Sequence, residues 1–155
     1  MLLTRQFPAE HCERAMESWA WLAIADKTPV MSSLFGDLFF VAEDGYWFLD
    51  TIEGTLDRQW RNRDDLQSSL ASDEGLDEFL LGRLAEAAHR SGPILASNEV
   101  YDFAIPPILG GEFSVENLRT RDFVVSVHIA GQLIHQGRAG AGRNPRRRSW
   151  SDQSA

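Results

Sequence analysis

The apolar residues of positions 36–60 alternate between two faces, as the side chains of antiparallel strands do. Asp44-Gly45 divides this stretch and is a strong signal for a two-residue turn, because both central residues of such a turn need positive φ. Glu53-Gly54 would turn the chain again before residues 55–60. We therefore predict a β-meander. In its first strand, Leu38 and Phe40 would point to one face and Phe39 and Val41 to the other. In its second strand, Tyr46 and Phe48 would point to one face and Trp47 and Leu49 to the other.

Both faces of this meander are apolar and aromatic, although an antiparallel sheet commonly leaves one face polar toward water. Some other part of the structure, or a partner, must therefore cover the second face. We predict that helices at 8–23, 75–90 and near 121–136 cover most of both faces. A residual apolar patch would remain for a partner protein.

The first helix is predicted over residues 8–23. Pro8 suits the first turn of a helix. Four apolar residues follow at helical spacing, namely Cys12, Met16, Trp19 and Leu22. Cys12 falls on this apolar stripe, so we expect a buried structural thiol. Residues 26–33, which include Thr28-Pro29, are predicted to be a loop.

Two further helices are predicted after the meander. Asn62 should cap a short helix that contains Leu66 and Leu70, and Asp73 should cap a longer one. The apolar stripe of the longer helix comprises Leu76, Phe79, Leu80, Leu84, Ala87 and Ala88. Ser91-Gly92-Pro93 should end it, because glycine favours the C-terminal cap and proline cannot continue a helix.

The C-terminal half contains one clear strand and one ambiguous segment. Glu99–Ile105 is predicted to be a strand, and PPILGGEF a connection, because proline cannot donate ladder hydrogen bonds. In 121–136 a strand pattern and a helix pattern overlap, the first in Val125, Val127 and Ile129, the second in Phe123, Val127, Ala130 and Ile134. The length of the segment favours a helix, with Thr120 as its N-cap and Asp122 near its N-terminus.

The composition is that of one globular domain. Of the 155 residues, 43% are hydrophobic and 25% are charged. No apolar run approaches the ~20 residues that span a bilayer, so we expect no membrane partner. The single cysteine excludes an internal disulfide and fits a reducing compartment, which predicts a cytoplasmic location.

The net charge of −8 is distributed unevenly. Residues 138–155 carry five arginines and one aspartate, which leaves a net charge of −12 on residues 1–137. A body this acidic repels nucleic acid and attracts basic proteins. We therefore expect a basic protein partner and no direct nucleic-acid binding. The Gly-, Arg- and Ser-rich tail at 138–155 has the composition of a flexible segment.

Little in the sequence points to catalysis. No pair of the four histidines has zinc-ligand spacing, and His128 with His135 would need a further ligand to hold a metal. There is no phosphate-binding glycine loop, nucleophile elbow or metalloprotease motif. We therefore expect no metal and no cofactor. Asp37 and Asp50 flank the apolar strands and could either cap turns or form the acid–base pair of a hydrolase.

The aromatic residues suggest where a partner would bind. The chain has five tryptophans, and tryptophan is a common anchor of protein interfaces, although the same residues could form a large aromatic core. We predict a docking patch built on Trp21, Tyr46 and Trp60 and rimmed by Glu43, Asp44, Asp57, Asp64 and Asp65.

Five stretches in a fixed order carry a family resemblance. They are ESWAWL, FGDLFFVAEDGYWFLDTIEGTL, FLLGRLAEAA, YDFAIPPILGGEFSVEN and DFVVSVHIAGQLIHQ. Over about residues 7–137 the sequence thereby resembles the C-terminal domain of bacterial type VI secretion DNase-immunity proteins. The G-D-L-F-F…W-F-L-D-T…G-T-L block and the P-P-I-L-G-G block are its most specific parts.

The resemblance implies an α+β domain with a central antiparallel sheet packed with helices. It implies a cytosolic, non-enzymatic protein that binds a secreted toxin, often a nuclease, and neutralises it in the cell that makes it. The family has no shared catalytic residues. Its motif positions look architectural and are here Gly36, Asp37, Leu49, Asp50, Gly54, Pro106, Pro107, Leu109, Gly110 and Gly111.

Two hypotheses stay beside the immunity protein. The same fold could serve as a regulatory or scaffold module that binds another protein or forms a homodimer, and an enzyme could work through carboxylates near Asp37 and Asp50. Many family members carry a GAD-like domain ahead of this one, whereas here we expect a single α+β domain at 1–137 followed by the tail at 138–155.

Overall fold

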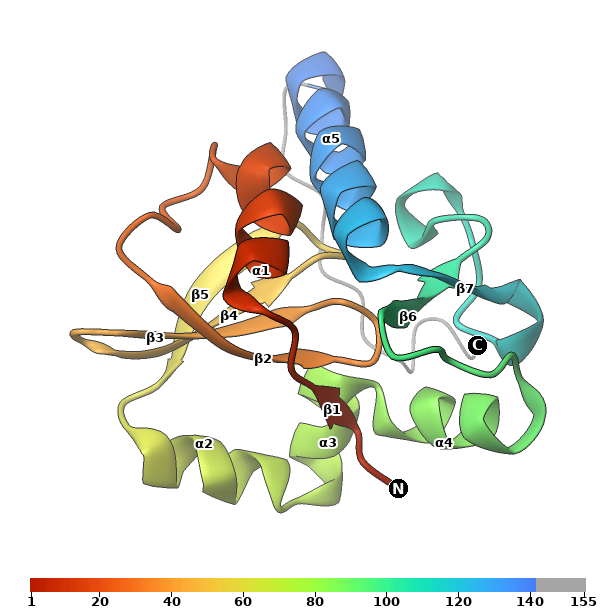
Figure 1. The fold of residues 1–155 in the computed structure, drawn as a ribbon, viewed down its shortest axis with the longest axis horizontal. Helices are drawn as coiled ribbons and strands as arrows, with labels where there is room; N and C mark the ends of the chain where they lie inside the picture. The colour runs from red at the N-terminus through yellow and green to blue at the C-terminus, as the bar shows by residue number, and fades with distance from the viewer. Residues whose placement is uncertain (142–155) are drawn as a thin grey trace.

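Within residues 1–141, the part of the chain that the computed structural model describes, five strands form an antiparallel sheet and two more strands pair beside it (Figure 1). Side chains are described as far as Arg138. The larger sheet holds, in spatial order, β1 (Thr4–Arg5), β2 (Thr28–Ser33), β3 (Leu38–Ala42), β4 (Gly45–Asp50) and β5 (Thr55–Trp60). The smaller sheet pairs β6 (Glu99–Phe103) with β7 (Leu118–Asp122). The helices are α1 (Ala9–Met16), α2 (Arg63–Leu70), α3 (Asp73–Leu80), α4 (Gly82–Ser91) and α5 (Phe123–Ala141).

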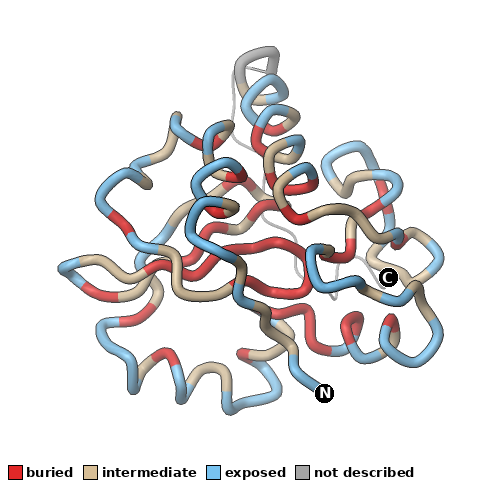
Figure 2. Tube along the Cα trace, viewed as in Figure 1, coloured by how far each residue is buried: buried red, intermediate tan, exposed pale blue. Residues whose placement is uncertain are grey.

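The predicted α+β class and central meander are confirmed. Helices lie on both sides of the larger sheet, α1 and α5 on one and α2 and α3 on the other (Figure 1). Buried residues run along the central strands (Figure 2). One face packs Leu38, Phe40 and Leu49 against α1 and α5, and the other packs Phe39, Phe48 and Trp60 against α3. The protein's own helices therefore cover both apolar faces, as predicted.

The first hairpin turn lies one residue earlier than predicted. Ala42 faces Gly45 across the hairpin, so Glu43 and Asp44 are its central residues. The positive φ, +138°, belongs to Gly45. A Cβ on that residue would lie 2.5 Å from the carbonyl oxygen of Trp60. The glycine is therefore needed for the close approach of β5 as well as for the turn.

The N-terminal helix is shorter than predicted, and the predicted loop at 26–33 is largely a strand. α1 ends at Met16 and continues as a 3₁₀ turn over Glu17–Trp19. Trp19 is fully buried, and its indole Nε1 donates to the carbonyl oxygen of Val127 at 2.9 Å, which anchors the turn on α5. β2 accommodates Pro29 because the register with β3 shifts between Pro29 and Met31, as proline in a sheet requires.

The single helix predicted over 75–90 is two helices. Leu81 is both the C-cap of α3 and the N-cap of α4. Its φ is +50°, and among the described non-glycine residues it alone has a positive φ. The break lets α3 pack on the larger sheet, while α4 packs on the smaller one through Leu84, Ala85 and Ala88. The N-cap of α3 is Ser72, whose side chain accepts from the Gly75 N–H at 3.0 Å, and not the predicted Asp73.

The ambiguous segment at 121–136 is a helix, as its length suggested. Its N-terminus is capped by Asp122, whose Oδ2 accepts from the Val125 N–H at 3.1 Å, whereas the predicted cap Thr120 lies in β7. The pairing of β7 with β6 was not anticipated. α5 runs on to Ala141, so it includes the first residues of the predicted tail, and residues 142–155 lie outside the described part of the chain.

Candidate functional site

Asp37 and Asp50 hold turns of the larger sheet. Asp37 is 3% exposed and accepts from the Ser33 hydroxyl (2.9 Å), the Thr51 N–H (2.9 Å) and the Thr51 hydroxyl (2.7 Å). Asp50 accepts from the N–H groups of Ile52 and Glu53, both at 2.9 Å. Asp37 thus joins the β2–β3 turn to the β4–β5 turn, and Asp50 caps the second. These contacts favour the turn-capping interpretation over an acid–base pair.

The environment of Asp37 disfavours its charged form. Burial raises its pKa to about 7, and the negative charge of Asp50 adds to the rise, while the hydrogen bonds from Thr51 and Ser33 oppose it. A carboxyl with such a pKa could in principle move protons. Its nearly complete burial and its three protein donors leave its oxygens engaged with the two turns instead.

The motif glycines of these turns lie directly beneath α5. Gly36 has φ +92°, and a Cβ there would lie 2.9 Å from Cγ2 of Val127. Gly54 has φ +75°, and a Cβ there would lie 2.5 Å from Cγ2 of Ile134. The motif block of the meander therefore sets how closely α5 approaches the sheet.

The second motif block, Pro106–Gly111, forms a rigid loop beside α5. Pro107–Leu109 is a 3₁₀ turn, and Gly110 ends it with φ +92°. A Cβ on Gly111 would overlap the carbonyl oxygen of Ile105. Asn117, which sequence reasoning missed, ties the loop at both ends: its Oδ1 accepts from the Ile105 N–H at 2.9 Å, and its Nδ2 donates to the carbonyl oxygens of Ile105 and Glu112, each at 2.9 Å.

A groove lies between this loop and α5, with a volume of about 120 Å³. We call it the α5 groove. It is lined mainly by apolar residues, among them Phe103, Pro107, Ile108, Ile129, Leu133 and Ile134. The surface around it is also apolar: the exposed fractions are 42% for Ile129, 56% for Ile105 and 64% for Leu109. Clusters of exposed apolar side chains on a folded domain commonly mark interaction sites.

One end of the α5 groove is charged. Asp102 of β6 faces two arginines of β7, with 2.9 Å from its Oδ2 to Nε of Arg119 and 3.4 Å to Nε of Arg121. Its other oxygen, Oδ1, accepts from the hydroxyl of Ser126 on α5 at 3.0 Å. All four residues line the groove. The two guanidinium groups and one carboxylate leave a local charge of +1 in an otherwise acidic protein.

The sequence of α5 contains a signal for this groove, a second apolar stripe beside the one that packs on the core. Phe123, Val127, Ala130 and Ile134 form the stripe that packs on the core. Ile129 and Leu133 form a second apolar stripe at helical spacing on another side of α5. A helix that is apolar on more than one side needs a second contact. The loop that supplies the opposite wall could not be placed from local pattern.

The aromatic residues of the predicted docking patch do not meet. Trp60 is 5% exposed and belongs to the core cluster on the α3 side of the sheet. Trp21 packs on the opposite side, against the cluster beneath α1 and α5, and its ring stacks on His135 at 4.9 Å between centroids. The sheet therefore separates the two tryptophans, and the predicted surface that spans both does not form.

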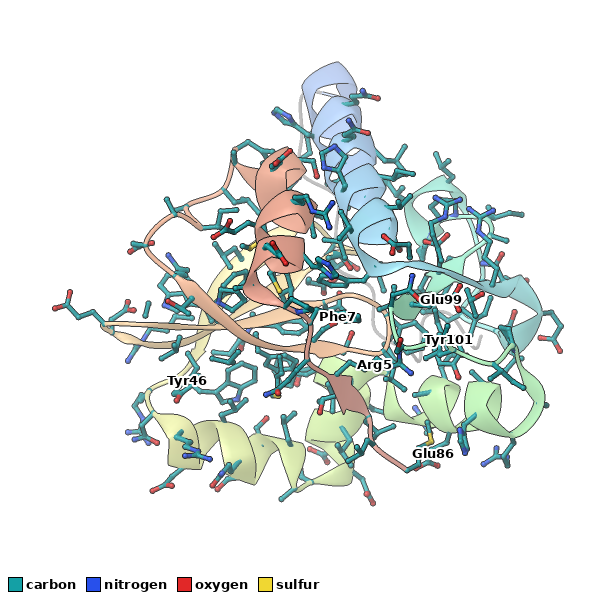
Figure 3. All side chains as sticks on the ribbon, in the orientation of Figure 1. Arg5, Phe7, Tyr46, Glu86, Glu99 and Tyr101 are labelled. Carbon is teal, nitrogen blue, oxygen red and sulfur yellow. The ribbon has the colours of Figure 1, made fainter. Side chains whose placement is uncertain are left out.

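The acidic residues of the predicted rim lie near Tyr46. Tyr46 pairs in register with Trp60 and lies on the α2 side of the sheet (Figure 3). Glu43 and Asp44 form the β3–β4 turn, Asp57 is exposed on β5, and Asp64 and Asp65 lie in the first turn of α2. Asp65 pairs with Arg61 at 2.8 Å, and Oδ1 of Asp44 accepts from Nε1 of Trp47 at 2.9 Å. Whether they bind a partner stays a prediction.

The N-terminal residues connect the larger sheet to the smaller one. Arg5 of β1 donates through Nη1 to the carbonyl oxygens of Ala96 (2.6 Å) and Glu99 (3.0 Å), next to Tyr101 (Figure 3). Phe7 stacks on Phe123, the first residue of α5, with ring centroids 3.9 Å apart. These contacts hold the start of α5, and hence one wall of the groove, in a fixed position.

Residues 61–134 match the family T6SS immunity protein Tdi1, C-terminal. The Tdi1 match runs from just before α2 through most of α5 and includes the loop, β6 and β7, so it covers most of the residues that line the α5 groove. It confirms the resemblance to type VI secretion immunity proteins.

A solved structure extends the likeness to most of the fold. The crystal structure of Atu4351 from Agrobacterium tumefaciens is similar with a TM-score of 0.57 and 15% sequence identity, over 84% of this chain. This chain spans 66% of that one. At such low identity the likeness shows the fold alone. No curated protein matches the sequence.

Three features of the described residues bear on a metal site, a membrane span and a reactive thiol. Within residues 1–141 no group of three or more His, Cys, Asp and Glu side chains is arranged to hold a metal ion. No helix of that part is long and apolar enough to cross a membrane. Cys12 is 5% exposed, and burial raises the pKa of its thiol, so the predicted buried thiol is confirmed.

Proposed function

We propose that this protein is a non-enzymatic immunity protein that binds and neutralises a secreted antibacterial toxin, a nuclease effector of a type VI secretion system. The observation that carries the proposal is the Tdi1 match over residues 61–134. Most of the residues that line the apolar α5 groove fall in this range, and the groove has the character of a protein contact. The turn-bound Asp37 and Asp50 support a binding role over a catalytic one.

The charge of the protein supports a nuclease as the partner. Nucleases bind a phosphate backbone and therefore carry basic clefts. Residues 57–78, which comprise most of β5, all of α2 and most of α3, contain seven acidic and three basic side chains. Such a surface attracts a basic protein and raises its rate of association. We place this encounter in the cytoplasm, where a toxin must be neutralised before it leaves the cell that makes it.

The proposal is tested by capture followed by reconstitution. The tagged full chain is incubated with a lysate of its own bacterium at low and at moderate salt, and bound proteins are identified by mass spectrometry. The captured candidate is then produced separately, and its nuclease activity is measured with and without an equimolar amount of the chain. We expect a basic nuclease whose activity falls on complex formation and whose toxicity is relieved when both are produced in one cell.

Two outcomes would overturn the proposal. A captured protein without nuclease activity or toxicity would favour a regulatory or scaffold module of the same fold. Recovery of the chain alone, or only as a homo-oligomer, would do the same. Where a toxin is captured, two charge-reversal variants show which surface meets it. One reverses Asp64 and Asp73 on the acidic surface, and the other reverses Glu10 and Glu13 of α1.

A further inference from the structure

The α5 groove has the size of one large side chain. Its volume is about 120 Å³, and an apolar cavity of roughly 150 Å³ is enough to hold benzene. Its floor is formed by Phe103, Val127 and Ile134, which are at most 8% exposed, and its rim by Ile108 and Ile129, which are 37% and 42% exposed. A buried floor with an exposed apolar rim is the arrangement that receives an anchor residue of a partner protein.

The groove is built before any partner binds. The hydrogen bonds of Asn117 hold the loop wall, and the contact of Trp19 with Val127 holds the α5 wall. Gly110 and Gly111 fix the shape of the loop through positive φ and through close backbone contact respectively. A preformed site loses little conformational entropy on binding, which increases the affinity for a side chain of matching shape.

The charge at the end of the groove specifies the neighbour of that anchor. Arg119 and Arg121 share one carboxylate, Asp102, and all three line the groove. The side chains of Arg119 and Arg121 are 47% and 26% exposed, so both remain accessible to a ligand. Guanidinium groups bind carboxylates through charge-assisted hydrogen bonds. The local charge of +1 would therefore be balanced by one carboxylate of the occupant.

We infer that the α5 groove receives a segment of the toxin in which a large apolar side chain stands next to a carboxylate. The apolar side chain would fill the space between Ile108 and Ile129, and the carboxylate would lie at Arg119 and Arg121. This inference rests on the proposed function, because it takes the toxin as the partner. It adds the contact that fixes the complex after the acidic surface has attracted a basic protein.

The chemistry of the groove can be tested without the toxin. The isotope-labelled full chain is titrated with N-acetylphenylalanine, which carries an aromatic ring and a free carboxylate, and in parallel with its amide, which lacks the carboxylate. Backbone amide shifts are followed by NMR. We expect the acid to shift the signals of Ile108, Ile129 and Leu133 with a Kd of about 1 mM, as suits a ligand of this size. The amide should bind at least about threefold more weakly.

A matched pair of variants tests whether the arginines bind the carboxylate of the ligand. Arg119→Gln removes the excess positive charge and should abolish the difference between acid and amide. Arg83→Gln removes an equally charged, exposed side chain on α4 that pairs with Asp77, and should leave the difference unchanged. Equal affinities of acid and amide for the native chain, shifts confined to another surface, or no shifts up to about 10 mM would each overturn the inference.

The second test uses the toxin identified by capture. Ile129→Asp places a charge at the mouth of the groove and should weaken the toxin complex by at least about 30-fold, as expected for a central anchor site. Val125→Asp is the control, because Val125 is 45% exposed on the same helix and does not line the groove. It should change the affinity by less than about threefold. Thermal unfolding of both variants checks that they fold.

The outcomes separate the two proposals. A native chain that binds and neutralises the toxin, together with an Ile129→Asp variant that binds as tightly as Val125→Asp, would overturn the groove inference and leave the proposed function standing. Failure of the native chain to bind any toxin would overturn the proposed function, and with it the toxin as the occupant. The fragment titration would still decide the chemistry of the groove.

Discussion

Asp37 is the residue on which two turns of the larger sheet depend. Its two oxygens accept from Ser33 in one turn and from Thr51 in the other, so a single buried carboxyl links four consecutive strands. Sequence pattern singled it out as either a turn cap or a catalytic group. The hydrogen bonds show that it caps both turns, and its burial should make the stability of the protein depend on pH.

The stability of the protein should fall as the pH rises from about 4 to about 7. Burial raises the pKa of Asp37 from its ordinary value of 3.8 to about 7, so in this range the folded state holds a proton that the unfolded state has lost. The stabilisation is complete below the lower value and is lost as the pH passes the upper one. It amounts to on the order of 4 kcal/mol.

Urea unfolding of the native chain and of Asp37→Asn between pH 4 and pH 8 measures this effect. The variant has no titrating group at this position and should lose most of the slope, whereas Asp57→Asn, at an exposed position of β5, should keep it. Parallel pH profiles of the native chain and Asp37→Asn would contradict the prediction.

The two glycines at the end of the groove loop should differ in their tolerance of alanine. Gly110→Ala has open space around the new Cβ and needs only the left-handed conformation, which costs about 1–2 kcal/mol. Gly111→Ala would force the Cβ into the carbonyl oxygen of Ile105 and must move the loop. We expect a larger loss of unfolding free energy for Gly111→Ala, measured by chemical denaturation. Equal losses of unfolding free energy in the two variants would contradict the close contact between Gly111 and the carbonyl oxygen of Ile105.

At the scale of elements, local capping and long-range packing have separate effects. Asn62 begins α2 as its sequence predicts, because its side chain satisfies a backbone N–H that has no partner within the helix. Leu81, by contrast, takes the left-handed conformation between α3 and α4, whereas the glycine lies one residue later, at Gly82, as the first residue of α4. The two halves bury their apolar faces in two different clusters, and this packing offsets the strained backbone of Leu81.

The cap of α2 can be tested on its own. Asn62→Ala removes the acceptor for the Asp65 N–H, which lies 2.9 Å from Oδ1, and should lower the unfolding free energy by about 1 kcal/mol. Asn62→Gly should cost only a few tenths of a kcal/mol, because glycine leaves the N–H open to water. Thermal or chemical denaturation of the two variants provides the measurement. Equal losses for both would show that the cap contributes little.

At the scale of the whole molecule, charge and apolar surface occupy different places. The helices α2 and α3 lie on one side of the larger sheet and α5 on the other (Figure 1). The acidic residues of β5, α2 and α3 therefore lie apart from the groove that α5 lines. If the proposed function holds, the first surface should govern the rate of encounter with a basic toxin and the second the lifetime of the complex.

Salt should therefore act mainly on the association rate of the complex. Between about 50 mM and 500 mM NaCl the Debye length falls severalfold, so we expect the association rate constant to drop by about tenfold or more. The dissociation rate constant should change much less. Ile129→Asp should show the reverse pattern, with faster dissociation at every salt concentration. Surface plasmon resonance separates the two rates, and a salt-independent association rate would contradict electrostatic steering.

The sequence by itself determined the local features of this protein. The period-two alternation of the meander, the cap at Asn62 and the helical state of the last segment depend on neighbouring residues, whose backbone preferences act without the rest of the fold. The motif positions could likewise be recognised, through the resemblance to the immunity family.

Only the tertiary structure decided how those pieces meet. The placement of Pro29 in a bulged strand, the break at Leu81 and the burial of Trp60 away from Trp21 each follow from packing between distant segments. The α5 groove is the clearest case, since its walls come from residues as far apart as Phe35 and Ile134. Periodicity tells which side of an element is apolar, whereas the shape of a site depends on which other element covers that side.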